Sequence, residues 1–145
     1  RIIEKSEPGQ KAMDQLKSEF TDLKSKLDTK KAEIDKLRQA IQKQSVMLSQ
    51  EAKTDKELEF KRKVRDFQDM YKAYQNKMQA KEKELSAPII QKLAEVIDAY
   101  GDKHNYSFIM DKRNSGLVYG SNALEITEKI MVELNKAWRN QQQAE

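Results

Sequence analysis

The sequence has 145 residues, of which 36% are charged and 37% hydrophobic, and its net charge at pH 7 is +4. Typical globular domains have about 25% charged and about 45–50% apolar residues, so this composition argues against an ordinary globular fold. The sequence contains no cysteine, which excludes thiol catalysis, disulfides and a cysteine-based zinc site. It also contains no run of about 18 apolar residues that would predict a membrane span.

The first ten residues are interrupted by Pro8 and Gly9, a dipeptide typical of turns, and a helical pattern follows them. From Met13 to Leu48 the steps between apolar residues alternate between three and four. Nine of the eleven positions in this series are apolar, and the two exceptions are Lys30 and Gln44. This spacing predicts a long coiled-coil helix over residues 13–48.

A second apolar series extends from Phe60 to Leu85 and is out of phase with the first. Between the two series, Thr54 and Glu57 fit the capping box that starts a helix. We therefore expect two antiparallel helices joined by a turn near residues 50–54. The alternative is one unbroken helix, because neither glycine nor proline marks the turn.

Pro88 is expected to break or kink the second helix, since proline lacks an amide hydrogen and clashes with the preceding turn. We take it as the joint between a helical hairpin arm, residues 11–87, and a body made of residues 1–10 and 88–145. Within the body the apolar stripe resumes at Ile89, and Gly101 is a candidate helix cap.

Residues 106–120 alternate in polarity around Asn114–Gly116, a pattern that predicts two short strands and a turn. A final helix is expected from Thr127. The predicted fold class is mostly α with a small β body (α+β), in which a long antiparallel coiled-coil hairpin projects from a β-sheet trimerisation body. A two-stranded hairpin alone is marginally stable, so we expect partner strands from a segment before Arg1 or from other subunits. The candidate sheet and trimer contacts are Tyr106, Phe108, Met110, Leu117 and Tyr119.

Basic residues concentrate in the predicted arm, where residues 11–85 hold 19 Lys and Arg and 14 Asp and Glu, a net charge of +5. This pattern indicates either a solvated helix face or a surface that steers an anionic partner. The densest basic run gives the first candidate binding residues, Lys61, Arg62, Lys63 and Arg65. Near the tip, Met47, Leu48 and Phe60 are candidates for binding or for closing the helical hairpin, and we favour closing contacts.

No catalytic function is expected. The sequence has no phosphate-binding glycine motif and no H-E-x-x-H motif, and its single histidine, His104, lies in a polar connection. Carboxylates alternate with lysines at helical spacing, which is typical of surface ion pairs. We expect no catalytic residue, no metal site and no cofactor.

The chain resembles the Skp/OmpH-like family of periplasmic chaperones over nearly its whole length. The resemblance rests on the order of four segments: KAMDQLKSEF, KRKVRDFQDMYKAYQ, APIIQKLAEVIDAYG and DKRNSGLVYGSNALEIT. It implies a homotrimer whose helical arms enclose a cavity that holds unfolded outer-membrane proteins, without ATP and in the periplasm. The family also has a strand before the first arm, which this sequence lacks, and an anionic lipid or lipopolysaccharide has been associated with it as a further partner.

Three other functions remain open from the sequence. The first is a structural or scaffolding coiled coil without client binding. The second is a prefoldin-like chaperone, although in that family the β hairpins lie between the two arm helices. The third is a basic nucleic-acid binder, which we do not expect to be specific because the arm aromatics lie on the predicted seam and so cannot stack on bases.

Overall fold

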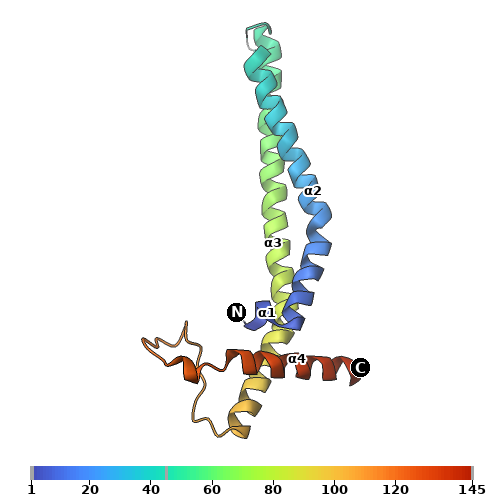
Figure 1. Ribbon diagram of the computed structural model, residues 1–145. Helices are drawn as coiled ribbons and strands as arrows, with labels where there is room; N and C mark the ends of the chain where they lie inside the picture. The colour runs from blue at the N-terminus through green and yellow to red at the C-terminus, as the bar shows by residue number, and fades with distance from the viewer. Residues whose placement is uncertain (1, 45, 145) are drawn as a thin grey trace. The chain divides into compact units, whose positions relative to one another are not determined.

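The computed structural model of the chain describes residues 2–44 and 46–144. They form α1 (Ile2–Lys5), α2 (Glu7–Gln44), α3 (Gln50–Lys103), the short 3-10 helix η1 (Asn122–Leu124) and α4 (Thr127–Ala144). Figure 1 shows these elements along the chain. The chain divides into two compact units, residues 16–81, called here the arm unit, and residues 1–15 with 82–145, called here the body unit.

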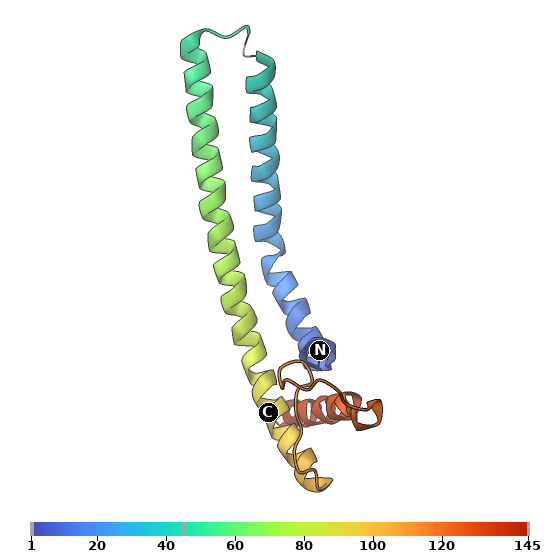
Figure 2. The same ribbon diagram turned by 90° about the vertical axis from the view of Figure 1, so that its left-hand side faces the viewer.

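The arm unit is a helical hairpin, which confirms the predicted pair of antiparallel helices. Figures 1 and 2 show α2 and α3 lying side by side in opposite directions. Phe20, Leu27 and Ile34, seven residues apart, are buried between them. The ring of Phe20 packs edge-on against Tyr74 with the centroids 5.7 Å apart. A seven-residue repeat keeps one face of a helix turned to its partner, so this seam follows directly from the sequence period.

The helices are joined earlier than the predicted 50–54, because α2 ends at Gln44 and α3 begins at Gln50. The Ser49 hydroxyl accepts a hydrogen bond from the amide of Ala52 at 3.3 Å, as an N-cap serine does. Thr54 instead lies inside α3, where its hydroxyl donates to the Gln50 carbonyl at 3.0 Å. The capping-box prediction for Thr54 is therefore wrong, and Ser49 supplies the cap.

The core of the body unit lies between α3 and α4. Ile89 and Val96 of α3 pack with Ile130 and Leu134 of α4, and all four are buried. Each pair is spaced by whole helical turns, which places its members on one face. Helix α3 continues through Pro88 without a break, and Pro88 lies exposed at the solvent side while the next residue, Ile89, is buried.

Helix α3 ends at Lys103, two residues beyond the predicted cap Gly101. Asn105 takes the left-handed conformation with φ of 56°, and the amide of Tyr106 donates to the Gly101 carbonyl at 3.0 Å. The amide of Asn105 also reaches the Asp102 carbonyl at 3.3 Å. These two bonds form a Schellman motif, in which asparagine replaces the more usual glycine.

The predicted β body is wrong. Residues 2–44 and 46–144 contain no strand, so the described chain is helical and the α+β class does not hold. A turn forms a little earlier than the predicted Asn114–Gly116, because the Ser115 amide donates to the Asp111 carbonyl at 2.9 Å; Gly116, with φ of 72°, follows it. The flanking segments do not pair, as expected for a lone hairpin without a third strand. The strand expected before Arg1 lies outside the described residues.

Candidate functional site

The basic candidates lie on α3 within the arm unit. Lys61, Arg62 and Arg65 are exposed, and the half-buried Lys63 places its Nζ 3.3 Å from Glu33 Oε2 of α2. Lys63 therefore forms an ion pair between the two helices as well as adding positive charge. The other three point their charge into solvent, where an anionic partner can reach them.

The apolar candidates near the turn divide into two kinds. Phe60 is half-buried, and the Arg38 guanidinium lies 5.9 Å from its ring centroid, so Phe60 belongs to the contact between α2 and α3. Leu48 is also half-buried. Met47 is 88% exposed and its neighbour Val46 is 92% exposed. The sequence reasoning did not single out Val46, because it falls outside the regular apolar series.

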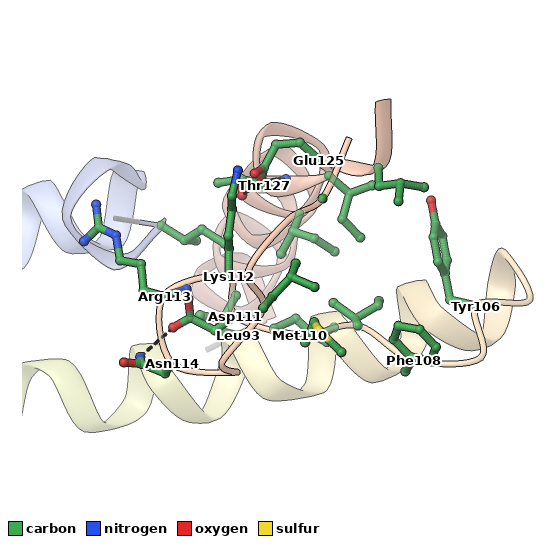
Figure 3. A pocket seen from close by; sticks show the side chains of 18 of the residues that line it. Leu93, Tyr106, Phe108, Met110, Asp111, Lys112, Arg113, Asn114, Glu125 and Thr127 are labelled. Atoms are coloured by element: carbon green, nitrogen blue, oxygen red, sulfur yellow. Dashed lines mark hydrogen bonds between the residues drawn. The ribbon is translucent and has the colours of Figure 1, made fainter. Parts of the chain in front are cut away.

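The candidate body residues lie along the irregular segment between α3 and α4. Phe108 is 72% exposed and Tyr119 is 83% exposed, and the other three are also exposed. Together these five residues line one hollow of about 800 Å³ in the body unit. Figure 3 shows Tyr106, Phe108 and Met110 along one side of this hollow, with Glu125 and Thr127 across from them. The structure thus brings the predicted body residues together, although not as a sheet.

Helices supply the remaining walls of the hollow. Ile2 and Ile3 come from α1, Leu93 and Ile97 from α3, and Ile130 from α4. These side chains pack on or belong to the body core, so the hollow opens directly onto that core. Exposed apolar surface next to a core is typical of a site that another polypeptide covers.

The rim of the hollow carries a compact polar turn. Asp111 accepts a hydrogen bond from the Arg113 amide at 2.9 Å and another from the Asn114 side chain at 2.8 Å. The Arg113 amide, together with Asn114 and the nearby positive charge, lowers the pKa of the Asp111 carboxyl against the opposing effect of burial. Hydrogen bonds to the charged form explain the direction of this change.

A second polar cluster joins the two ends of the body unit. The Arg139 Nε donates to Glu7 Oε2 at 2.8 Å, and its Nη2 donates to the other carboxylate oxygen. The amide of Glu7 donates to Asn135 Oδ1 at 2.9 Å. Sequence reasoning missed this cluster, since the partners are about 130 positions apart and no pattern pairs them.

In the part of the chain that the structure describes, no group of three or more His, Cys, Asp or Glu side chains is placed to hold a metal ion. None of the helices formed by residues 2–44 and 46–144 is long and apolar enough to cross a membrane.

The comparisons with known proteins agree on one family. Residues 1–134 match the family model described as outer membrane protein (OmpH-like). A crystal structure of a candidate outer membrane chaperone (OmpH-like) from Caulobacter crescentus shares the fold, with a TM-score of 0.64 and 18% sequence identity. The similarity covers 94% of this chain and 79% of that one. No curated protein matches the chain.

The family match covers well over half of the sequence, and the crystal structure from Caulobacter crescentus shares the fold over most of the chain. The chain therefore belongs to the OmpH-like outer membrane protein family.

Proposed function

We propose that the chain is an ATP-independent holdase chaperone. It binds unfolded outer-membrane proteins in the periplasm and prevents their aggregation in a cavity between the arms of a homotrimer. In this proposal the arm comprises residues 11–87 and the body comprises residues 1–10 and 88–145. The protein acts by binding, without catalysis, cofactor or specific nucleic-acid recognition.

The observation that carries the proposal is the open apolar hollow of about 800 Å³ in the body unit. A single chain leaves Phe108, Val118 and Tyr119 largely in water, which is unfavourable for a stable monomer. Covering them by copies of the same chain would remove this apolar surface from water and hold three arms together. The chaperone description of the structurally similar protein supports the same conclusion.

The arms would then attract the unfolded client. Their exposed cations Lys61, Arg62 and Arg65 offer charge without a fixed geometry. Such contacts speed the encounter and remain individually weak, so the client stays mobile and can be released without nucleotide. The exposed tip residues Val46 and Met47 add apolar contacts. An anionic lipid or lipopolysaccharide is a further proposed partner.

The test is light scattering of an unfolded outer-membrane β-barrel protein diluted from urea, without ATP. We expect the chain to suppress scattering at about one trimer per client. The triple variant Lys61→Gln, Arg62→Gln, Arg65→Gln should need more protein for the same suppression, because steering by charge is lost.

A matched variant removes three positive charges from the body instead, with Lys103→Gln, Lys129→Gln and Lys136→Gln. It should suppress scattering as the unsubstituted chain does. No suppression by any of the three proteins would overturn the holdase function and leave the scaffolding coiled coil as the better account.

A further inference from the structure

Glu7, the first residue of α2, contacts Asn135 and Arg139 in the middle of α4. We call these contacts the clasp. The clasp has three hydrogen bonds: one from the Glu7 amide to Asn135 and two from Arg139 to the Glu7 carboxylate. One turn further along α4, the Gln142 Oε1 accepts from Lys11 Nζ at 3.3 Å. Since Asn135, Arg139 and Gln142 are spaced by four and three residues, one face of α4 follows the first turns of α2.

The clasp lies next to the junction of α1 and α2, which the buried Ser6 holds in place by hydrogen bonds. Ser6 is fully buried, and its hydroxyl donates to the Ile3 carbonyl at 3.0 Å and accepts from the Gly9 amide at 3.3 Å. Ser6 separates α1 from α2. Because Ser6 fixes α1 to the start of α2, whatever holds Glu7 also holds α1 in place.

Helix α1 cannot hold its own position. It has four residues, and a helix of one turn is unstable alone in water because nucleation is unfavourable. Yet Ile2 and Ile3 of α1 form one wall of the hollow in the body unit and pack on its core. The packing of Ile2 and Ile3 on the core, the contacts of α1 with α4 and the clasp together hold this wall in place.

We propose that the clasp is a conformational latch that keeps α1 closed as a wall of the hollow, so that the hollow keeps its shape only while the clasp is formed. The charged partners Glu7 and Arg139 are both exposed. Exposed ion pairs contribute little each, so the latch opens by thermal motion and is sensitive to any change of charge at either residue. This inference concerns the chain alone and holds whether or not the hollow binds another copy.

Hydrogen exchange measures the latch directly at the amides of residues 6, 7 and 9, which donate to the Ile2 carbonyl, Asn135 and the Ser6 hydroxyl, because exchange reports local opening. The variants are Glu7→Arg, Arg139→Glu and the double variant that carries both. Each single change places like charges face to face, whereas the double variant restores an opposite-charge pair with the order reversed. The control is Lys136→Glu, which makes the same charge change on α4 at a residue that pairs with Glu133 outside the clasp.

We expect each single variant to exchange these amides about fivefold faster or more. The double variant should return to within about twofold of the original rate, and Lys136→Glu should leave it unchanged. The lone tryptophan, Trp138, packs on the core beside Arg139 and supplies a second readout. Its emission should shift toward that of exposed tryptophan in the single variants only.

The proposal is overturned if the single variants exchange the amides of residues 6, 7 and 9 at the original rate. It is also overturned if the double variant remains as fast as the single ones, because that result would mean the charges do not act as a pair. Should a single variant fail to fold, seen as a loss of helical circular dichroism, Asn135→Ala replaces it. This substitution removes the acceptor of the Glu7 amide without changing any charge, and it must also accelerate exchange.

Discussion

Gly9 lies in the body unit so close to the backbone of α1 that no side chain fits there. A Cβ atom at this position would lie 1.5 Å from the Ile3 carbonyl oxygen and 3.2 Å from the Ser6 hydroxyl. The carbonyl belongs to α1 and cannot turn aside as a flexible side chain can. Gly9 is therefore required by the close approach of α1 to the first turn of α2, although its own backbone is helical.

Gly9→Ala should lower the free energy of unfolding of the chain by about 2–3 kcal/mol, because α1 must move away from α2. Urea unfolding followed by circular dichroism measures the change. The matched control is Gly101→Ala in α3, where a Cβ would make an ordinary contact at 3.6 Å with Ile109. There we expect a gain of about 0.5–1 kcal/mol from helix propensity. Equal changes in the free energy of unfolding at the two positions would contradict the conclusion that Gly9 is required by the close approach of α1.

The protonation of Glu7 links the stability of the body unit to pH. The hydrogen bond from Arg139 lowers the pKa of Glu7, and the charges of Arg139 and Lys11 act in the same direction, against a partial opposing effect of burial. A carboxyl whose pKa is lower in the folded state stabilises the fold at pH values above its ordinary pKa. That contribution is lost as the pH falls through the lowered pKa.

Titration of the Glu7 carboxyl by NMR should therefore give a pKa below the ordinary value of about 4.3. In Arg139→Gln the pKa should rise toward the ordinary value, because the donor of both side-chain hydrogen bonds is gone. Lys136→Gln, which removes a charge from the same helix outside the clasp, should leave the pKa of Glu7 where it was. A pKa that is the same with and without Arg139 would refute this assignment.

At the scale of the elements, the spacing of apolar residues predicted the helices correctly and the strands wrongly. The seven-residue series through Phe20, Leu27 and Ile34 gave the hairpin, because a coiled-coil seam is a local property of the sequence. The alternation over 106–120 predicted strands that do not form among the described residues, because a strand also needs a neighbour. The body residues still gather around one hollow, since their apolar character drives them toward the core.

Two features were beyond sequence reasoning for a physical reason. The clasp joins Glu7 to Asn135 and Arg139 across nearly the whole chain, and nothing local marks such a pair. Ser49 and Thr54 are both residue types that cap the start of a helix, so the sequence alone does not say which of them caps α3. The structure decides between them through the hydrogen bonds that each hydroxyl makes.

The packing of α3 on α4 makes Leu134 the most sensitive core position of the body unit. It is fully buried and packs in the same cluster as Ile89 and Ile130. Leu134→Ala should lower the free energy of unfolding by about 2–5 kcal/mol, since it removes buried methyl groups and leaves a cavity. Val132→Ala, two residues away and half exposed, is the control and should change the stability by less than about 0.5 kcal/mol. A small effect at Leu134 would contradict the core described here.

At the scale of the whole molecule, positive charge is concentrated in the residues of the predicted arm. Residues 11–85 carry a net charge of +5, and the remaining residues carry a net charge of −1. A field of this kind acts over a Debye length of about 8–10 Å at physiological salt. In the proposed function the cations on α3 therefore govern how fast a client arrives rather than how long it stays.

The association rate of an unfolded outer-membrane protein should fall about tenfold when the ionic strength rises from about 0.05 M to about 0.5 M. Stopped-flow fluorescence with a labelled client measures this rate. The variant Lys61→Gln, Arg62→Gln, Arg65→Gln should begin slower and depend less on salt. A rate that is independent of salt in the unsubstituted chain would exclude charge steering as the role of these residues.

The mass of the protein in solution, with and without an unfolded client, tests the central claim most directly. Analytical ultracentrifugation should find a species of about three times the 16.9 kDa chain mass. On adding the client without ATP, this species should gain the mass of one client molecule and keep it soluble. A chain that stays at 16.9 kDa while the client aggregates beside it would contradict the proposed trimeric holdase.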